Sequence, residues 1–124
     1  MNIALWIVQG LLGLAFVAMG YYHGFNVEQA KGRPGMQWMG VVPRGLMTFI
    51  GIAEMLGGVG LILPAATGIL PWLTPVAAGL LALVLVLAAL FHLPRREYPN
   101  MVFNGVLLAL ALLVAVGRGW IAPL

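Results

Sequence analysis

Four long apolar stretches, separated by shorter segments that contain most of the polar residues, run along this chain. Each stretch is about 20 residues long, the length that an α-helix needs to cross the hydrocarbon core of a bilayer. The stretches cover residues 3–23, 45–63, 72–92 and 99–117. The pattern therefore predicts an all-α protein, a four-transmembrane-helix bundle, in which residues 1–124 form a single transmembrane domain.

The connections between the stretches predict how the helices follow one another. Residues 24–43 form a long connection in which glycine and proline interrupt any helix, whereas residues 64–71 form a short connection without charged residues. So short a connection makes the second and third helices antiparallel neighbours, and we expect the second helix to stop at Pro64. The first helix has no basic residue ahead of it, and we expect it to be retained rather than cleaved.

Composition supports a membrane protein and excludes several chemistries. Charged residues make up 7% of the chain, against roughly 25% in soluble domains, and the mean hydropathy is +1.07. The net charge of +3 does not indicate nucleic-acid binding, because the basic residues fall in two connections between apolar stretches. The chain has no cysteine, so thiol chemistry, Fe–S clusters and cysteine-held metals are excluded.

The distribution of Lys and Arg predicts the orientation in the membrane. Four crossings leave both termini on one side of the membrane and the connections 24–43 and 93–98 on the other. The side with the termini carries one basic residue, Arg118. The other side carries Lys31, Arg33, Arg44, Arg95 and Arg96. By the positive-inside rule, these two loops are cytoplasmic and both termini lie outside the cytoplasmic (inner) membrane.

A weak internal repeat is also present. Residues 10–23 and 79–92 both end in an aromatic residue followed by histidine, and the Met-x-Phe-x-Gly motif at 47–51 recurs at 101–105. Either apolar sequences align here by chance, or the first two helices repeat as the last two, in a parallel two-helix repeat about an axis along the membrane normal. In the second case the two histidines are symmetry mates.

Glu54 lies at the centre of the apolar run 46–63 and is the main anomaly of the sequence. A charged carboxylate at mid-bilayer depth costs roughly 2.5 to 3.5 kcal/mol, so this side chain must face protein, water or a ligand. Helical spacing places small residues on the same face, which lets neighbouring helices approach closely. That face carries Gly51, Glu54, Gly58 and Leu61. Similar small-residue contacts are expected at Ala78 and Ala82, and at Gly105 and Ala109.

Counting residues from the predicted helix ends predicts a polar funnel that opens to the cytoplasm. At 1.5 Å per residue, Glu54 lies about 15 Å deep, at the bottom. His92 and Asn104 lie only about 5 and 8 Å deep, and His23 is similarly shallow, so these three form the mouth. Trp38 is expected to anchor its loop at the interface, with a cover for the funnel as the alternative.

For each of these polar residues, a structural role is possible as well as a functional one. A neutral Glu54 side chain can donate to a carbonyl such as a quinone oxygen or relay a proton, or it can simply fix helix packing. His23 and His92 invite a bis-imidazole haem, but capping or headgroup contact is the simpler reading. Asn104 is expected to bridge helices in preference to binding ligand. Histidine, asparagine and a distant glutamate offer too few close ligands for zinc.

Three segments of the sequence resemble the DoxX-like family of small four-helix membrane proteins. They are FIGIAEMLGGVGLILP at 49–64, TGILPWLTP at 67–75 and FHLPRRE at 91–97. The resemblance implies work beside quinone-linked redox enzymes, because the family is named for the small membrane subunit of a thiosulfate:quinone oxidoreductase. Distant relatives serve as assembly or cargo factors. Glu54 and His92 match recurrent polar positions of the family. His23 stands where the family often has lysine, so no anion-binding role follows there.

The hypothesis from sequence is an accessory subunit of a quinone-linked oxidoreductase that binds a hydrophobic, quinone-like molecule around Glu54. The expected ligand-binding side chains are Glu54, His92, His23, Asn104 and Trp38. The chain has no redox centre or catalytic motif of its own, so electrons must come from a bound cofactor or a membrane-associated partner oxidoreductase. The alternatives are a non-enzymatic assembly or binding protein without redox ligand, and a proton or solute carrier. Self-association is left open.

Overall fold

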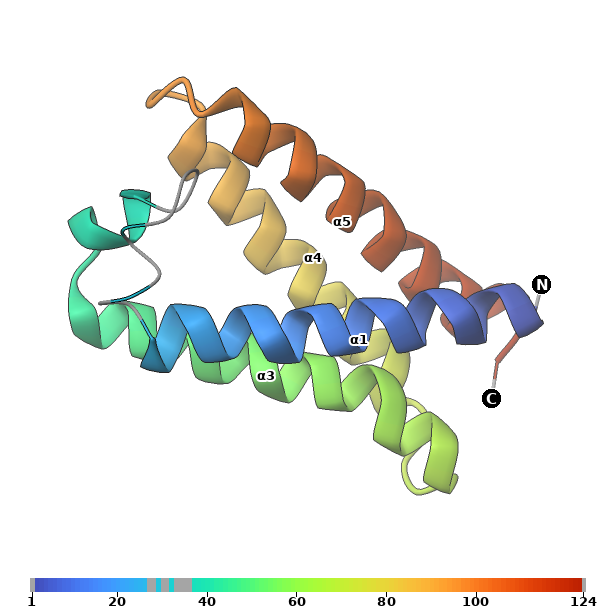
Figure 1. Cartoon of the computed structure of the whole chain (residues 1–124). Helices are drawn as coiled ribbons and strands as arrows, with labels where there is room; N and C mark the ends of the chain where they lie inside the picture. Colours follow the sequence, from blue (N-terminus) through green and yellow to red (C-terminus); the bar gives the residue numbers. More distant parts are fainter. Residues whose placement is uncertain (1, 27–28, 30–31, 33–36, 124) are drawn as a thin grey trace.

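In a computed structural model of the chain, four long helices form an all-helical bundle (Figure 1). The structure describes residues 2–26, 29, 32 and 37–123. In these residues the four long helices are long and apolar enough to cross a membrane, which confirms the predicted class. The long helices are α1 (Asn2–Phe25), α3 (Arg44–Thr67), α4 (Leu73–His92) and α5 (Tyr98–Val116). There are two short elements: the 3₁₀ helix η1 (Gln37–Val41) precedes α3, and the π-helix η2 (Gly117–Ile121) follows α5.

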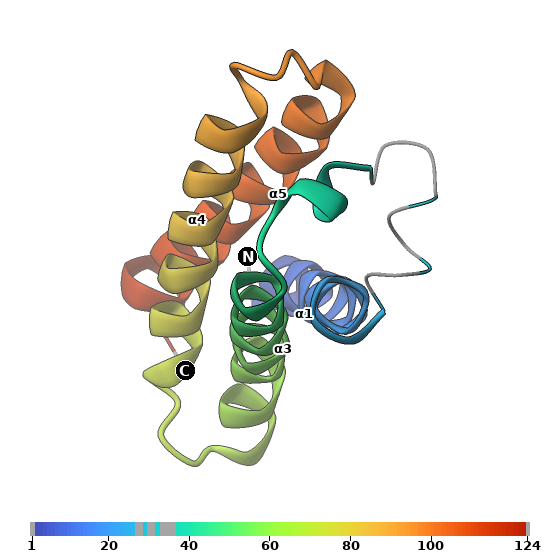
Figure 2. The same ribbon diagram turned by 90° about the vertical axis from the view of Figure 1, so that its left-hand side faces the viewer.

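The long helices are arranged as two pairs, α1 with α3 and α4 with α5 (Figures 1 and 2). Both chain termini and the α3–α4 turn lie at one end of the bundle, called here the terminal end. The opposite end, called the loop end, carries η1 and the α4–α5 turn. As predicted, α3 and α4 are antiparallel neighbours, and both termini share one side. The two pairs diverge toward the loop end, and this divergence leaves room for a site (Figure 1).

The apolar core lies where all four helices meet, and apolar side chains also cover the outward faces. The core comprises Leu12, Phe16, Leu61, Ala78, Leu81, Ala82, Leu85, Leu107, Ala111 and Val114. On the outward faces, residues such as Leu14, Leu56 and Val102 are about two-thirds exposed. Exposed apolar side chains on the outer faces are favourable in hydrocarbon and unfavourable in water, so the helices contact the lipid bilayer.

Glycine contacts bring α1 and α3 together. A Cβ atom on Gly51 would lie 2.5 Å from the carbonyl oxygen of Gly20 and from the backbone of Gly24, and one on Gly58 would lie 2.6 Å from the Gly13 carbonyl oxygen. The face of α3 predicted to be buried is therefore the buried one. The contact predicted at Gly105 is wrong, because nothing lies within 4 Å of its Cβ position. The buried face of α5 lies one position round the helix, on Asn104, Leu107, Ala111 and Val114.

The helix α3 continues past Pro64, where the sequence predicted its end. Proline has no N–H, so the carbonyl of Gly60, four residues earlier, loses its helical donor. The buried hydroxyl of Thr74 at the start of α4 donates to that carbonyl at 3.2 Å instead. The helix therefore runs to Thr67, and Gly68 ends it with a φ of 71°, a left-handed conformation that glycine adopts readily.

Candidate functional site

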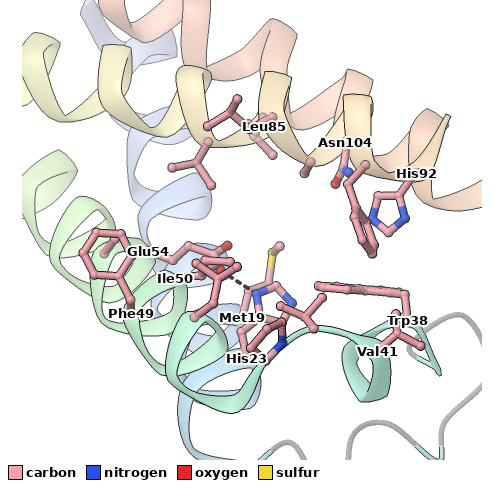
Figure 3. A pocket seen from close by; sticks show the side chains of 18 residues that line it. Met19, His23, Trp38, Val41, Phe49, Ile50, Glu54, Leu85, His92 and Asn104 are labelled. Atoms are coloured by element: carbon pink, nitrogen blue, oxygen red, sulfur yellow. Dashed lines mark hydrogen bonds and ion pairs between the residues drawn. The ribbon is translucent and has the colours of Figure 1, made fainter. Parts of the chain in front are cut away.

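A cavity of about 450 Å³ lies near the loop end, where the two helix pairs diverge (Figure 3). Its lining comes from α1, η1, α3, α4 and α5, and most of it is apolar, including Met19, Phe49, Ile50 and Leu85. The side chains with polar atoms are Glu54, His23, His92, Asn104 and Trp38. The structure thus brings all five side chains singled out from the sequence to one cavity.

His23 and Glu54 form a buried pair on one wall of the cavity. The His23 Nδ1 atom lies 2.5 Å from Glu54 Oε1, and the Glu54 residue is only 3% exposed. Sequence reasoning was wrong to separate them by depth. The Glu54 side chain leans toward the N-terminus of its helix, as helical side chains do, and so reaches back to the level of His23. The proton between them is held as an imidazolium–carboxylate or as a neutral acid–base pair.

His92 lies on the opposite wall of the cavity and is held by Glu97. The His92 Nδ1 atom lies 2.9 Å from Glu97 Oε1, and Arg95 Nε donates to the same oxygen at 2.8 Å. Burial of the Glu97 carboxyl acts to raise its pKa, but the hydrogen bonds from His92 and Arg95 outweigh it, and the pKa is lowered. This arrangement fixes the imidazole of His92, which is 2% exposed. Glu97 belongs to the FHLPRRE segment but was not singled out from sequence.

Trp38 lies between the two histidines at the loop end of the cavity (Figure 3). Its ring centroid is 5.3 Å from that of His23 and 5.1 Å from that of His92, both in edge-to-face geometry. Met39 is fully buried against Met47 and so holds η1 in place. The sequence allowed two roles for Trp38, an interface anchor or a cover of the funnel. The position of its ring between the two histidines fits a cover of the cavity.

Asn104 faces the cavity from α5 and is 8% exposed (Figure 3). The sequence predicted that it bridges helices, but within the described residues its amide makes no hydrogen bond to another group. The amide atoms of Asn104 are still accessible from the cavity. Among the described residues, every completely buried side-chain N or O atom has a hydrogen-bond partner, so the amide of Asn104 is not completely buried. A buried amide with free donors and acceptors is uncommon in proteins and calls for an explanation.

Metal binding finds no support in the part of the chain that the structure describes. No three side chains among its histidines and acids gather in one place. His23 and His92 are each paired with a different glutamate, and the Trp38 ring lies between them. A haem held by both imidazoles would have to displace this indole.

A second polar cluster, missed from sequence, lies at the terminal end. Arg118 is 3% exposed and donates through Nε to Gln9 Oε1 at 2.8 Å and through Nη1 to Asn2 Oδ1 at 2.6 Å. Gln9 in turn donates to the Leu61 carbonyl at 2.7 Å. The cluster ties α1 to α3 and η2. A signal was available, because Gln9 is four residues after Leu5 and thus shares its buried face.

Four apolar helices around a buried acid define this protein as an integral membrane helix bundle. Residues 7–114 match the DoxX-like family, and the chain belongs to that family. The match covers the cavity and every side chain with a polar atom in its lining. No curated protein and no solved structure matches the chain significantly.

Proposed function

We propose that this protein binds a hydrophobic, quinone-like molecule in the cavity between its helix pairs and serves as an accessory subunit of a quinone-linked oxidoreductase. The observation that carries the proposal is the Asn104 amide, which has no hydrogen-bond partner among the described residues and faces the buried His23–Glu54 pair across an apolar cavity. A volume of about 450 Å³ falls within the range of small-molecule sites, roughly 300 to 1,000 Å³. Such sites typically combine an apolar lining with a few placed polar groups.

The polar groups suit a ring that carries carbonyl or hydroxyl oxygens. The Asn104 amide can donate to a carbonyl or accept from a hydroxyl. The His23–Glu54 pair holds a proton within the same cavity and can exchange it with a bound oxygen. The chain itself then binds and orients the ring and handles a proton, while electrons are supplied by a partner enzyme.

The aromatic side chains that cover the cavity favour a single quinone-like ring over a haem macrocycle as the occupant. Trp38 contacts both imidazoles by edge-to-face packing, and Phe91 adds to the same aromatic group at 5.9 Å from the indole. A flat ring can pack against these side chains without moving them. In the cytoplasmic membrane, with the loop end inside, the cavity would lie near the cytoplasmic surface.

Binding by the purified protein tests the proposal. We expect a lipid extract of the protein to contain quinone, and added quinone to bind in detergent or nanodiscs. Asn104→Leu and Glu54→Gln should weaken binding, whereas Phe103→Leu should leave it unchanged, because Phe103 adjoins Asn104 on the outward face and is 53% exposed. Unaltered affinity in both cavity variants would overturn the assigned roles. No quinone together with a stably co-purifying polypeptide would favour the assembly-protein alternative.

A further inference from the structure

A second cavity, of about 570 Å³, lies between α3 and α4 and continues from the first. Its lining side chains are all apolar or glycine. The two cavities share four lining residues, so they are two parts of one crevice. The shared residues are Phe49 and Ala53 on α3 and Val84 and Leu87 on α4.

Polarity changes along this crevice. The acid, the imidazoles and the free amide gather at the loop end, in the first cavity. Beyond the shared residues, the second cavity, called here the tail groove, extends to Gly60 and Leu73 near the α3–α4 turn. From Phe49 to Gly60 the tail groove follows α3 for eleven residues, which is about 16 Å at 1.5 Å per residue. A polar head site thus opens into a long apolar channel.

The tail groove opens sideways toward lipid. Residues along its rim are largely exposed, with Leu56 at 68%, Leu80 at 60% and Leu83 at 55%. Because α3 and α4 cross the membrane, these side chains meet hydrocarbon and not water. Elsewhere around the first cavity, Trp38 packs across the loop end, and glycine contacts bring α1 close against α3.

We propose that the ligand is a lipid with a single long hydrocarbon tail, whose polar head lies between Glu54 and Asn104 and whose tail lies along the tail groove. This inference rests on the proposed function. The ligand enters sideways from the bilayer between α3 and α4. Its tail leaves one apolar environment for another, so affinity comes from the polar head. The tail groove decides which molecules fit, because it lets a tail stay in hydrocarbon while the head is bound.

A pair of matched tryptophan variants tests this inference. Val76 lines the tail groove but not the first cavity and is 46% exposed, so Val76→Trp should fill the tail groove and leave the head site open. Val86 is on the same helix, lines neither cavity and is 41% exposed, so Val86→Trp is the matched control. Two probes carry the same benzoquinone head, one without a tail and one with an isoprenoid tail. Both should bind the wild-type protein.

We expect Val76→Trp to weaken binding of the tailed probe by about tenfold or more, because the indole occupies the space of the tail, and to leave the tailless probe within about twofold. Val86→Trp should change neither. A thermal melt shows whether Val76→Trp is folded, and Val76→Phe, which fills less of the tail groove, replaces it if it is not. A tailed probe with a photoreactive terminal group should label Leu80 or Leu83 and spare Leu90.

The outcomes separate this inference from the proposed function. If both probes bind and Asn104→Leu weakens both, but Val76→Trp does not selectively weaken binding of the tailed probe, the tail groove is overturned and the proposed function stands. If neither probe binds wild-type protein, the proposed function fails and takes this inference with it. If a phospholipid without the quinone head displaces the tailed probe from the tail groove, the groove holds bilayer lipid, and the inference is overturned.

Discussion

The Nδ1 atom of His23 lies 2.5 Å from Oε1 of Glu54, so the two residues, on neighbouring helices, form a hydrogen-bonded pair inside the bundle. This pairing shelters the acid that the sequence places in the middle of an apolar helix. It also offsets part of the cost that either group would have alone in a medium without water.

The costs of removing the two members of this pair should therefore not be additive. His23→Leu leaves a buried acid without its partner, and the loss of stability for a broken buried pair is about 3 to 5 kcal/mol. The double variant His23→Leu/Glu54→Leu should be less destabilised than the sum of the single variants. Unfolding in detergent, followed by circular dichroism, measures this. Simple additivity would contradict the pairing.

Gly51 should tolerate no side chain. A Cβ atom there would meet the backbone of Gly20 and Gly24 at 2.5 Å, and backbone atoms move aside less easily than side-chain ends. We expect Gly51→Ala to push α1 from α3 and to destabilise the protein by about 1 to 3 kcal/mol. Gly105→Ala is the control, because its Cβ position is open. Equal melting temperatures for the two variants would disprove the close helix contact.

The cluster at the terminal end predicts a rescue. Gln9→Leu removes the acceptor of Arg118 Nε and should destabilise the protein by about 1 to 3 kcal/mol, since a buried charged donor loses its partner. Adding Arg118→Met should restore part of the loss, because an apolar side chain needs no acceptor. Melting temperatures of the two variants in the same detergent decide this. A double variant less stable than Gln9→Leu would count against the cluster.

The Glu97 carboxylate predicts a pH dependence at the loop end. Hydrogen bonds from His92 and Arg95 outweigh burial and lower its pKa below the ordinary value of 4.5. A lowered folded-state pKa stabilises the protein above the unfolded pKa, and this contribution is lost as pH falls through the folded-state value. Wild type should therefore melt above Glu97→Gln at neutral pH, and the difference should vanish in acid. A difference that grows on acidification would reverse the assigned sign.

The orientation can be tested by labelling, because the chain has no cysteine. Single cysteines are introduced as Ala122→Cys at the terminal end and Arg96→Cys at the loop end. If the termini lie outside, a membrane-impermeant maleimide should label the first variant in intact cells and the second only after lysis. The opposite pattern would invert the predicted topology.

Much of the candidate site could be predicted because its residues are anomalous in their surroundings. Glu54 stands out in an apolar helix, and His23 and His92 end two helices whose ends the hydrophobic pattern locates to within a few residues. Gln9 and Arg118 escaped notice because a neutral amide and a basic residue near a chain end look ordinary in sequence. The end of α3 was misplaced because Thr74, on another helix, replaces the hydrogen bond that Pro64 removes.

The sequence by itself determined the number, order and approximate length of the membrane-crossing helices, since the length of an apolar run depends only on neighbours along the chain. It also determined which ionisable residue needs shelter. Only the tertiary structure decided that His23 provides that shelter, that the Asn104 amide has no partner among the described residues, and that a second cavity lies between α3 and α4. These features depend on how closely and at what angle helices pack, and side chains far apart in sequence set both.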